Sequence, residues 1–242
     1  MSVPLLLIGH GRMGRQVEAF CGEFGMHVAG VIDRHSAQNP DRWPEAEVAI
    51  DFSRAEAVPQ NLPRLAARGI SVAIGTTGWQ EHEAALRAEA DRHRIGVVAA
   101  ANFALGVSLF LALAERAAEL LGAHPAFGAW LYEQHHAAKR DAPSGTALAI
   151  ERALRARGYA HPIDVASTRA GQIPGTHTLG FDSISETITL THTARDRAVF
   201  ARGALAAAAW VRGRSGWFGV RDVLGIQQPA RHSATTAAQE SR

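Results

Sequence analysis

The first strand and the glycine loop behind it restrict the possible folds more than any other feature. Leu5–Ile8 is a short, wholly apolar run, as found in parallel strands buried on both faces. Residues 9–14 then read G-x-G-x-x-G and open a segment, Met13–Phe24, whose apolar side chains recur at helical spacing until Gly25. A second apolar run, His27–Ile32, follows. We therefore expect a strand, a glycine turn, a helix and a parallel strand.

The order of these segments favours dinucleotide binding over a plain βαβ unit, which the glycines alone would leave open. Gly9 and Gly11, followed by Arg12 and Met13, would let the backbone approach a pyrophosphate at the helix start. An acid near the spacing of Asp33 commonly holds ribose hydroxyls, which favours NAD(H), whereas the neighbouring Arg34 suits a 2′-phosphate. We expect contacts from Gly9, Gly11, Arg12, Met13, Asp33 and Arg34 to NADH or NADPH.

Strands and helices continue to alternate up to about residue 104, which is typical of an α/β domain with a parallel sheet. Ser53 is a candidate N-cap for the next helix, while Pro59 and Pro63 imply that this helix is broken or starts late. The further elements expected here are Val48–Phe52, Ser71–Ile74 and Gly96–Ala99 as strands and Gln80–Arg94 as a helix.

Two loops follow strands of this sheet at their carboxyl ends, where open α/β sheets bind ligands. One contains Gly75, Thr76 and Thr77, and the other is Ala101–Phe103, with Asn102 at its centre. Both would line the cofactor side of a site, although each also reads as an ordinary turn. Asn102 could hydrogen-bond a carboxamide or only shape its turn.

After the apolar helix expected at Leu105–Leu121, strands cluster instead of alternating with helices. This favours a smaller α+β domain with a mixed sheet beside a Rossmann-like domain. We expect a dinucleotide-binding domain from residues 1–104 and 198–228, a substrate-binding and oligomerisation domain from 105–197, and a disordered tail at 229–242. The remaining elements expected are strands Phe127–Tyr132, Ile163–Arg169, Thr176–Asp182 and Glu186–His192 and helices Thr146–Arg157 and Ala201–Val211.

The segment 133–147, EQHHAAKRDAPSGTA, concentrates the chemistry. His135 and His136 stand where the strand leaves the sheet, and Lys139 follows them; imidazole and ammonium groups can transfer protons or hold an anion. Ser144-Gly145-Thr146 would open a helix whose free N–H groups favour a carboxylate. The segment predicts a proton-transfer site for an anionic substrate. Taken singly, His135, His136 and Lys139 are better read as strand-end histidines and a solvated lysine, and only their combination favours a site.

The same segment, with every fixed position of E-x-H-H-x-x-K-x-D-A-P-S-G-T-A filled, resembles the signature of the 4-hydroxy-tetrahydrodipicolinate reductase (dihydrodipicolinate reductase) family. The loops Gly75–Gly78 and Ala101–Phe103 stand in the order that this family shows. Departures are a shorter glycine loop at Gly9–Gly11 and Thr176 at a position where the family is expected to carry glutamate.

The resemblance implies reduction of a cyclic unsaturated dicarboxylate, 4-hydroxy-tetrahydrodipicolinate, by hydride transfer from NADH or NADPH in lysine and diaminopimelate biosynthesis. It implies His135 as the acid, supported by Lys139, and a homo-oligomer, expected to be a tetramer. His136, Ser144, Gly145 and Thr146 would grip a substrate carboxylate, and Asn102 with Thr76 and Thr77 would line the nicotinamide side. Two alternatives remain: another nicotinamide-dependent reductase of a small amino or keto acid, and a non-catalytic dinucleotide sensor.

Composition argues against several other classes of protein. A formal charge of +2, without basic runs that interleave with aromatic residues, does not favour nucleic-acid binding. The single cysteine, Cys21, allows no internal disulfide, which fits a cytoplasmic location. The longest nearly apolar run, Ala104–Ala114, falls well short of the roughly 20 residues of a membrane span. Adjacent histidines without H-E-x-x-H spacing do not favour a metal.

Overall fold

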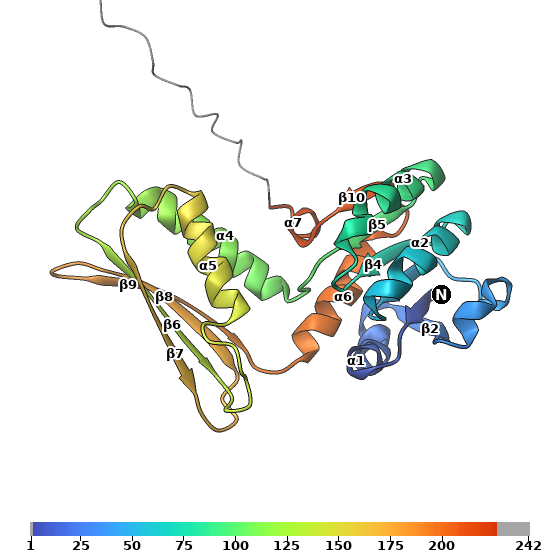
Figure 1. The fold of residues 1–242 in the computed structure, drawn as a ribbon, viewed down its shortest axis with the longest axis horizontal. Coiled ribbons are helices and arrows are strands. Elements are labelled where there is room, and N and C mark those ends of the chain that lie inside the picture. Colours follow the sequence, from blue (N-terminus) through green and yellow to red (C-terminus); the bar gives the residue numbers. More distant parts are fainter. Residues whose placement is uncertain (1, 227–242) are drawn as a thin grey trace, which may run out of the picture.

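The structure, a computed structural model, describes residues 2–226 and contains two sheets, each with its own helices (Figure 1). We call the sheet and helices of residues 2–104 and 198–226 the parallel-sheet unit, and those of residues 105–197 the mixed-sheet unit. The expected α/β class, with a Rossmann-like parallel sheet and a smaller mixed sheet, is confirmed. The tail expected at 229–242 lies outside the described residues.

The parallel sheet has the strand order β10-β5-β4-β3-β1-β2, and every neighbouring pair is parallel. After β1 the chain adds β2 on one side and later β3 on the other, so the direction of winding reverses between β1 and β3. A crevice at such a reversal is where open α/β sheets bind ligands. The strands are β1 Val3–Ile8, β2 Met26–Ile32, β3 Val48–Asp51, β4 Ser71–Ile74, β5 Gly96–Ala99 and β10 Gly216–Phe218.

Helices cover both faces of this sheet. α1 (Arg12–Phe20) and α6 (Ala198–Val211) share one apolar core with one face of the strands, and α2 (Val58–Ala67) and α3 (Glu83–His93) share another with the opposite face. The many buried alanines of α6 let the helix lie close to the strands. Because α6 comes from the end of the chain, the C-terminal segment returns to the N-terminal sheet, together with β10 and the short α7 (Val220–Val223).

The mixed sheet has the order β7-β6-β8-β9, in which β6 and β7 are parallel and the other pairs antiparallel. The strands are β6 Gly128–His135, β7 Ile163–Arg169, β8 Gly175–Asp182 and β9 Thr187–Ala194. Two helices, α4 (Leu105–Leu121) and α5 (Gly145–Ala156), pack on one face and bury residues such as Leu131, Ile150 and Phe181.

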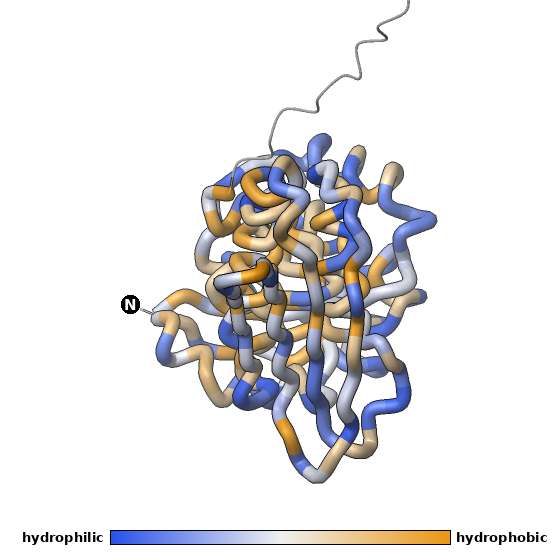
Figure 2. The backbone as a smooth tube through the Cα atoms, turned by 90° about the vertical axis from the view of Figure 1, so that its left-hand side faces the viewer, coloured by the Kyte–Doolittle hydropathy of each residue, from blue (hydrophilic) through white to orange (hydrophobic). Residues whose placement is uncertain are grey.

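The other face of the mixed sheet carries no helix within the described residues. Figure 2 shows it toward the viewer, with hydrophilic and intermediate colours along the strands. Threonines of β8 and β9 pair across it, with Thr178 and Thr191 hydroxyls 3.1 Å apart and Thr176 and Thr193 also 3.1 Å apart. Thr176, where the family is expected to carry glutamate, therefore points away from the helix-covered side.

Several predicted boundaries and one predicted cap are wrong. The helix expected at Met13–Phe24 ends at Phe20 and continues as a 3₁₀ turn, although Gly25, with φ +68°, ends the segment as expected. The strand expected at Phe127–Tyr132 runs on to His135. Ser53 does not cap α2; its hydroxyl donates to the buried Asp51 instead. α2 does start late, with a proline in its first turn.

One carboxylate joins the two units. Glu115 of α4 pairs with Arg157 at the end of α5, at 2.8 Å, and with Arg221 of α7, at 2.7 Å. Burial alone would raise the pKa of Glu115, but hydrogen bonds from Arg221 and Arg157 outweigh it and hold the pKa below its usual value. Among residues 2–226, no helix is both long and apolar enough to cross a bilayer.

Candidate active site

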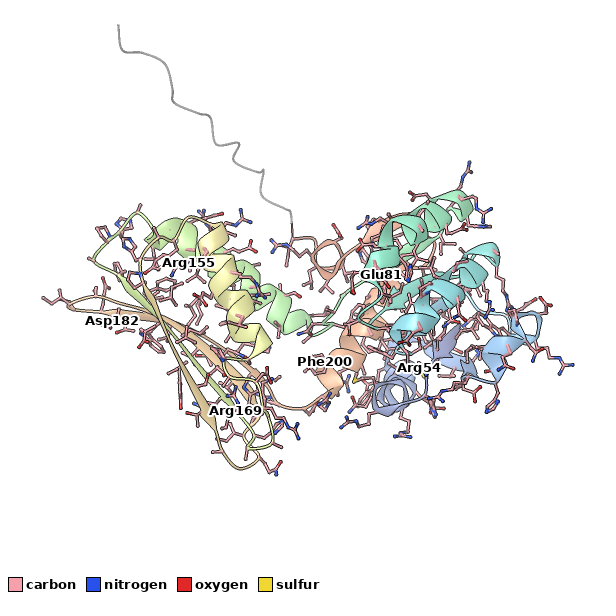
Figure 3. The ribbon with its side chains drawn as sticks, in the orientation of Figure 1. Arg54, Glu81, Arg155, Arg169, Asp182 and Phe200 are labelled. Carbon is pink, nitrogen blue, oxygen red and sulfur yellow. The ribbon has the colours of Figure 1, made fainter. Side chains whose placement is uncertain are left out.

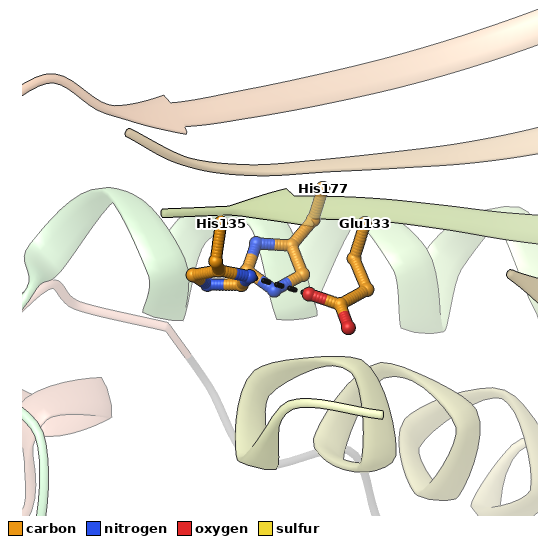
Figure 4. A group of neighbouring side chains, drawn as sticks. All are labelled: Glu133, His135 and His177. Atoms are coloured by element: carbon orange, nitrogen blue, oxygen red, sulfur yellow. Dashed lines mark ion pairs between the residues drawn. The ribbon is translucent and has the colours of Figure 1, made fainter. Parts of the chain in front are cut away.

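The register of the mixed sheet brings together polar groups that lie far apart in the sequence. Glu133 and His135 are two residues apart on β6 and therefore point to the same face. In the antiparallel pair β6–β8, Glu133 stands opposite His177, and in the parallel pair β6–β7, His135 stands beside Arg169. Figure 4 shows Glu133, His135 and His177 gathered on the face covered by the helices.

Glu133 is the centre of this group. Its side chain is fully buried, with Oε2 2.5 Å from His135 Nδ1 and Oε1 2.6 Å from Arg169 Nη2. Burial would raise the pKa of Glu133, but the hydrogen bond from Arg169 and the nearby positive charges lower it to about 2. Glu133 is therefore a carboxylate at every physiological pH.

His135 lies at the carboxyl end of β6 with 13% of its side chain exposed. Burial lowers the pKa of His135, Glu133 opposes that change, and Lys139 and Arg169 add to it, so that the pKa lies below its usual value. An imidazolium whose pKa is lowered is a stronger acid, so it transfers its proton more readily to a substrate. A Cβ placed on Gly175 would lie 3.0 Å from His135 Nε2, so the glycine leaves room for the ring.

His177 fills the space between His135 and helix α5. Its ring stands edge-on to that of His135, with centroids 5.1 Å apart, and its Nε2 lies 2.9 Å from Ser144 Oγ. Burial and the neighbouring positive charge of His135 lower the pKa of His177 to about 4. At neutral pH His177 is therefore an uncharged hydrogen-bonding partner of Ser144 and cannot donate a proton in place of His135.

The start of α5 supplies an anion-binding group beside these rings. Ser144 is the N-cap, and its hydroxyl accepts from the N–H of Ala147 at 3.2 Å. Gly145 and Thr146 are the next residues, and a Cβ on Gly145 would meet nothing within 4 Å, so the helix start is accessible there. Free N–H groups at a helix start favour a carboxylate. Ser144, Gly145 and Thr146 therefore lie at the start of α5 as expected, with the Asp141 carboxylate close to the N–H of Gly145; their binding of a substrate carboxylate stays a prediction.

Lys139 and His136 lie in the turn between β6 and α5. Lys139 Nζ lies 2.8 Å from both carboxylate oxygens of Asp141, and the N–H of Lys139 donates to the carbonyl of His136. Arg169 also donates to the carbonyl of Asp141, at 2.6 Å, which ties this turn to β7. Figure 3 shows Arg169 at the end of the mixed sheet where this turn lies.

The glycine loop lies in the parallel-sheet unit, at the reversal between β1 and β3. Gly9 has φ +87°, and a Cβ there would lie 2.6 Å from the carbonyl oxygen of Phe52. A Cβ on Gly14 would lie 2.3 Å from the carbonyl oxygen of Gly9, so both glycines are needed for the close turn. A Cβ on Gly11 would meet nothing within 4 Å, so the backbone is open there.

The open side of the loop faces a cavity of about 670 Å³, whose lining includes Gly9, Gly11, Asp33 and Arg34. One oxygen of Asp33 accepts from the N–H groups of His35 and Ser36, at 2.9 Å each, which shapes the turn after β2. A dinucleotide fits this arrangement of an open glycine backbone with an acid and a guanidinium at the same cavity.

Most of the remaining predicted cofactor residues line two further cavities. Gly11, Arg12, Met13, Gly75, Thr76 and Thr77 line one of about 370 Å³, and Thr76, Ala101 and Asn102 line another of about 600 Å³. Asn102 Oδ1 accepts from the N–H of Ala104 at 2.7 Å, so this side chain shapes its turn. Phe103 is 2% exposed and packs edge-on against Phe52, so its ring belongs to the core.

Glu133, His135 and His177 also offer atoms within 4.8 Å of one another that could, by position, hold a metal ion. Their surroundings favour hydrogen bonding instead. The cationic Arg169 already occupies Oε1 of Glu133, and Ser144 engages Nε2 of His177. A dication would meet a positive charge at this carboxylate, so the donor set fits a proton-transfer group better.

Three residues of the site were not predicted as functional: Glu133, Arg169 and His177. Glu133 opens the signature segment 133–147, although it lies just beyond the strand expected at Phe127–Tyr132. Arg169 and His177 lie far from that segment in the sequence, and their place beside Glu133 depends on strand register. Arg197 was likewise not assigned, yet it lines the 370 Å³ cavity together with the Thr76-Thr77 loop.

Comparisons with known proteins agree over almost the whole chain. The family models for the N-terminus and the C-terminus of dihydrodipicolinate reductase match residues 3–103 and 106–224. The 4-hydroxy-tetrahydrodipicolinate reductase of Acidiphilium cryptum is 42% identical over 236 residues, which is 89% of this chain and 94% of the relative. That of Thiobacillus denitrificans is 37% identical over 270 residues, covering 94% of this chain and 100% of the relative.

A solved structure shares the fold. Dipicolinate-bound dihydrodipicolinate reductase from Paenisporosarcina sp. TG-14 has a TM-score of 0.77 and 20% sequence identity. The match covers 90% of this chain and 98% of that one.

Proposed function

Because the chain belongs to the dihydrodipicolinate reductase family, we propose that it reduces 4-hydroxy-tetrahydrodipicolinate to tetrahydrodipicolinate with NADH or NADPH, in lysine and diaminopimelate biosynthesis. The observation that carries the proposal is that His135 packs against His177, which in turn contacts Ser144 at the N-terminus of α5. This segment offers a proton and a carboxylate-binding group side by side. A reductase of a ring that carries carboxylates needs both.

Within the mixed-sheet unit, the N–H groups of Gly145 and Thr146 bind one substrate carboxylate, with Ser144 holding the helix start in place. His136 and Lys139 add polar contacts from the preceding turn. The dipicolinate bound to the Paenisporosarcina enzyme supports a cyclic dicarboxylate as the ligand class. Lys139 contributes its charge when it exchanges its pairing with Asp141 for the substrate.

Reduced nicotinamide supplies the hydride that this reaction requires. His135 supplies the proton: once the ring has lost its 4-hydroxyl group as water, hydride adds to the carbon conjugated with the imine and leaves an electron-rich enamine, which takes a proton from the imidazolium at Nε2. The remaining neutral ring keeps its Nδ1 toward Glu133. Lys139 stabilises the anionic substrate during this step.

We assign the dinucleotide to the cavities along the parallel sheet. Residues 1–104 and 198–228 would form the dinucleotide-binding domain and 105–197 the substrate-binding domain; the packing of α6 and β10 on the parallel sheet supports this division. Gly9, Gly11, Arg12 and Met13 approach the pyrophosphate, and Asp33 and Arg34 the adenosine ribose. The loops at Gly75–Thr77 and Ala101–Phe103 then border the nicotinamide side.

The helix-free face of the mixed sheet supports a homo-oligomer, and we propose a tetramer built on it. Trp130 and Tyr132 lie partly exposed on this face among the paired threonines. Light scattering coupled to size-exclusion chromatography measures the mass of the oligomer directly. Thr178→Lys places a charge on the proposed interface and should lower that mass. The single cysteine, Cys21, supports a cytoplasmic location.

A steady-state assay tests the reaction. The substrate is generated in situ by its synthase, and loss of nicotinamide absorbance is followed with NADH and with NADPH. Substrate-dependent oxidation of either cofactor supports the proposal. Oxidation only with other amino or keto acids would favour a different reductase, and cofactor binding without oxidation by any substrate would favour a dinucleotide sensor.

A further inference from the structure

We propose that Glu133 is the positioning residue of this site, which fixes the tautomer of His135 and ties its ring to the carboxylate-binding start of α5. The inference rests on the proposed function, because it assigns how the proton donor of that reaction is held. Its basis is one buried side chain whose two oxygens face different partners. Oε2 faces His135, and Oε1 faces Arg169 and the backbone of Ser144.

The contact at Oε2 selects the tautomer. Nδ1 of His135 lies 2.5 Å from this oxygen, and neither atom has another hydrogen-bond partner among the described residues. Two lone pairs repel each other at that separation, so a hydrogen must lie between them, and the carboxylate can only accept. The neutral ring is therefore protonated at Nδ1, which leaves Nε2 as the nitrogen that gains and loses the catalytic proton.

The contact at Oε1 fixes the carboxylate itself. Arg169 donates to it at 2.6 Å, and the N–H of Ser144 points to it at 3.3 Å. Ser144 also caps α5 and meets His177, whose ring stands against His135. The proton donor and the helix start that would hold the substrate carboxylate are thus attached to one rigid group, so they move together.

The ionisable groups near His135 come from all four strands of the mixed sheet and from the turn after β6. Glu133 on β6 favours the imidazolium, while Arg169 on β7 and Lys139 in the following turn oppose it. His177 on β8 faces the ring as a neutral group at pH 7, and His192 on β9 lies beyond His177. Asp141 in the same turn is paired with Lys139, and Glu133 is the carboxylate in contact with the His135 ring, so its loss should move the pKa of His135 further down.

Glu133→Gln provides a test with a defined expectation. Two donors, Arg169 and Ser144, face the Oε1 position, so the carboxamide oxygen should take that place and turn its NH₂ toward His135. An NH₂ facing Nδ1 favours the opposite neutral tautomer, with hydrogen on Nε2. The substitution should thus switch the tautomer while it preserves the shape of the side chain.

The first measurement is the ¹⁵N NMR spectrum of the histidine rings in the substrate-free protein, with His135 identified by the signals lost in His135→Asn. Above the pKa, wild type should show hydrogen on Nδ1 and Glu133→Gln hydrogen on Nε2. A wild-type His135 protonated at Nε2 in its neutral form overturns the inference, whether or not the variant folds. This readout does not depend on any reaction.

The second measurement is the pH dependence of kcat/KM, with Glu186→Gln as the matched control, since Glu186 is exposed in the turn between β8 and β9. For Glu133→Gln we expect kcat to fall on the order of 10²–10⁴-fold, as for loss of the group that orients a catalytic histidine. KM for the cofactor should not change, and the alkaline limb of the profile should move to lower pH. An unchanged profile in a folded variant overturns the inference.

The two measurements separate the inference from the proposed reaction. If wild type fails to oxidise NADH or NADPH with this substrate but shows the expected tautomers, the reaction is wrong and the positioning role stands. If wild type is active but its tautomer is the opposite one, the positioning role is wrong and the reaction stands.

Discussion

Replacing His135 by glutamine removes the proposed acid and keeps a polar side chain at the end of β6. Losing a general acid typically costs about 10²–10⁴-fold in rate, or roughly 2.7–5.5 kcal/mol of transition-state stabilisation. The size of the rate loss depends on the groups around His135, because a neighbouring acid could donate the proton in its place. His177 and Lys139 both interact with the His135 ring and are considered in turn.

His177 cannot substitute at neutral pH. With a pKa of about 4, only about one molecule in a thousand carries the proton on this ring at pH 7. Lys139 is charged but paired with both oxygens of Asp141 at 2.8 Å, and an ammonium is a weaker acid than an imidazolium. We therefore expect kcat to fall about 10³-fold, in the middle of the general range.

The assay is the coupled steady-state reaction at saturating cofactor. KM for NADH and NADPH should stay within about twofold, because the glycine loop and its cavities lie in the other unit. His124→Gln is the matched control, since His124 is exposed in the turn before β6 and should leave kcat unchanged. A folded His135→Gln protein with kcat within tenfold of wild type would refute His135 as the proton donor.

Three further predictions concern Lys139, Arg34 and His177. Lys139→Ala should raise the substrate KM about tenfold, because a charge-assisted contact is lost, and should lower kcat; Asp141→Asn serves as the comparison, and no change in either constant would mean that Lys139 does not meet the substrate. Arg34→Ala should raise KM for NADPH about tenfold and leave that for NADH unchanged if its guanidinium meets the 2′-phosphate; equal effects on both cofactors would exclude that contact. The pKa of His177 is about 4 in the folded protein, below the value of 6.5 expected in the unfolded chain. The unfolded chain therefore binds the proton more tightly as the pH falls. As a result, the free energy of unfolding has its full value above pH 6.5 and falls by up to about 3 kcal/mol as the pH drops toward 4. His177→Asn should flatten this slope in urea titrations between pH 7 and 5, and an equally steep slope would show that His177 is not the group responsible.

Much of the fold could be predicted from local pattern. Ser71–Ile74, Gly96–Ala99, Leu105–Leu121 and Ile163–Arg169 have the predicted bounds, because apolar runs and helical spacing mark buried strands and amphipathic helices directly. Helix ends were less accurate. The apolar spacing of Met13–Phe24 continues through a 3₁₀ turn, which places side chains on nearly the same face as the helix before it.

The residues of the site also differ in how far local sequence could predict them. The histidines, the lysine and the helix start stand within one continuous segment, so the sequence displays them together. The partners of Glu133 on β7 and β8 do not belong to that segment. His177 reaches it through the antiparallel register of β6 and β8, and Arg169 reaches it through the parallel register of β6 and β7. Register is decided by the packing of whole strands, which no local pattern contains.

The shared carboxylate of Glu115 has a mechanical consequence. Removing one partner from a partly buried ion pair normally leaves a charge stranded, which is costly. Here Arg221 comes from α7 of the parallel-sheet unit and Arg157 from the mixed-sheet unit itself, so Glu115 remains neutralised when Arg221 lets go. Separation of the two units at this point would thus free only Arg221, whose side chain is 29% exposed, while the less exposed Glu115 keeps Arg157 as its partner.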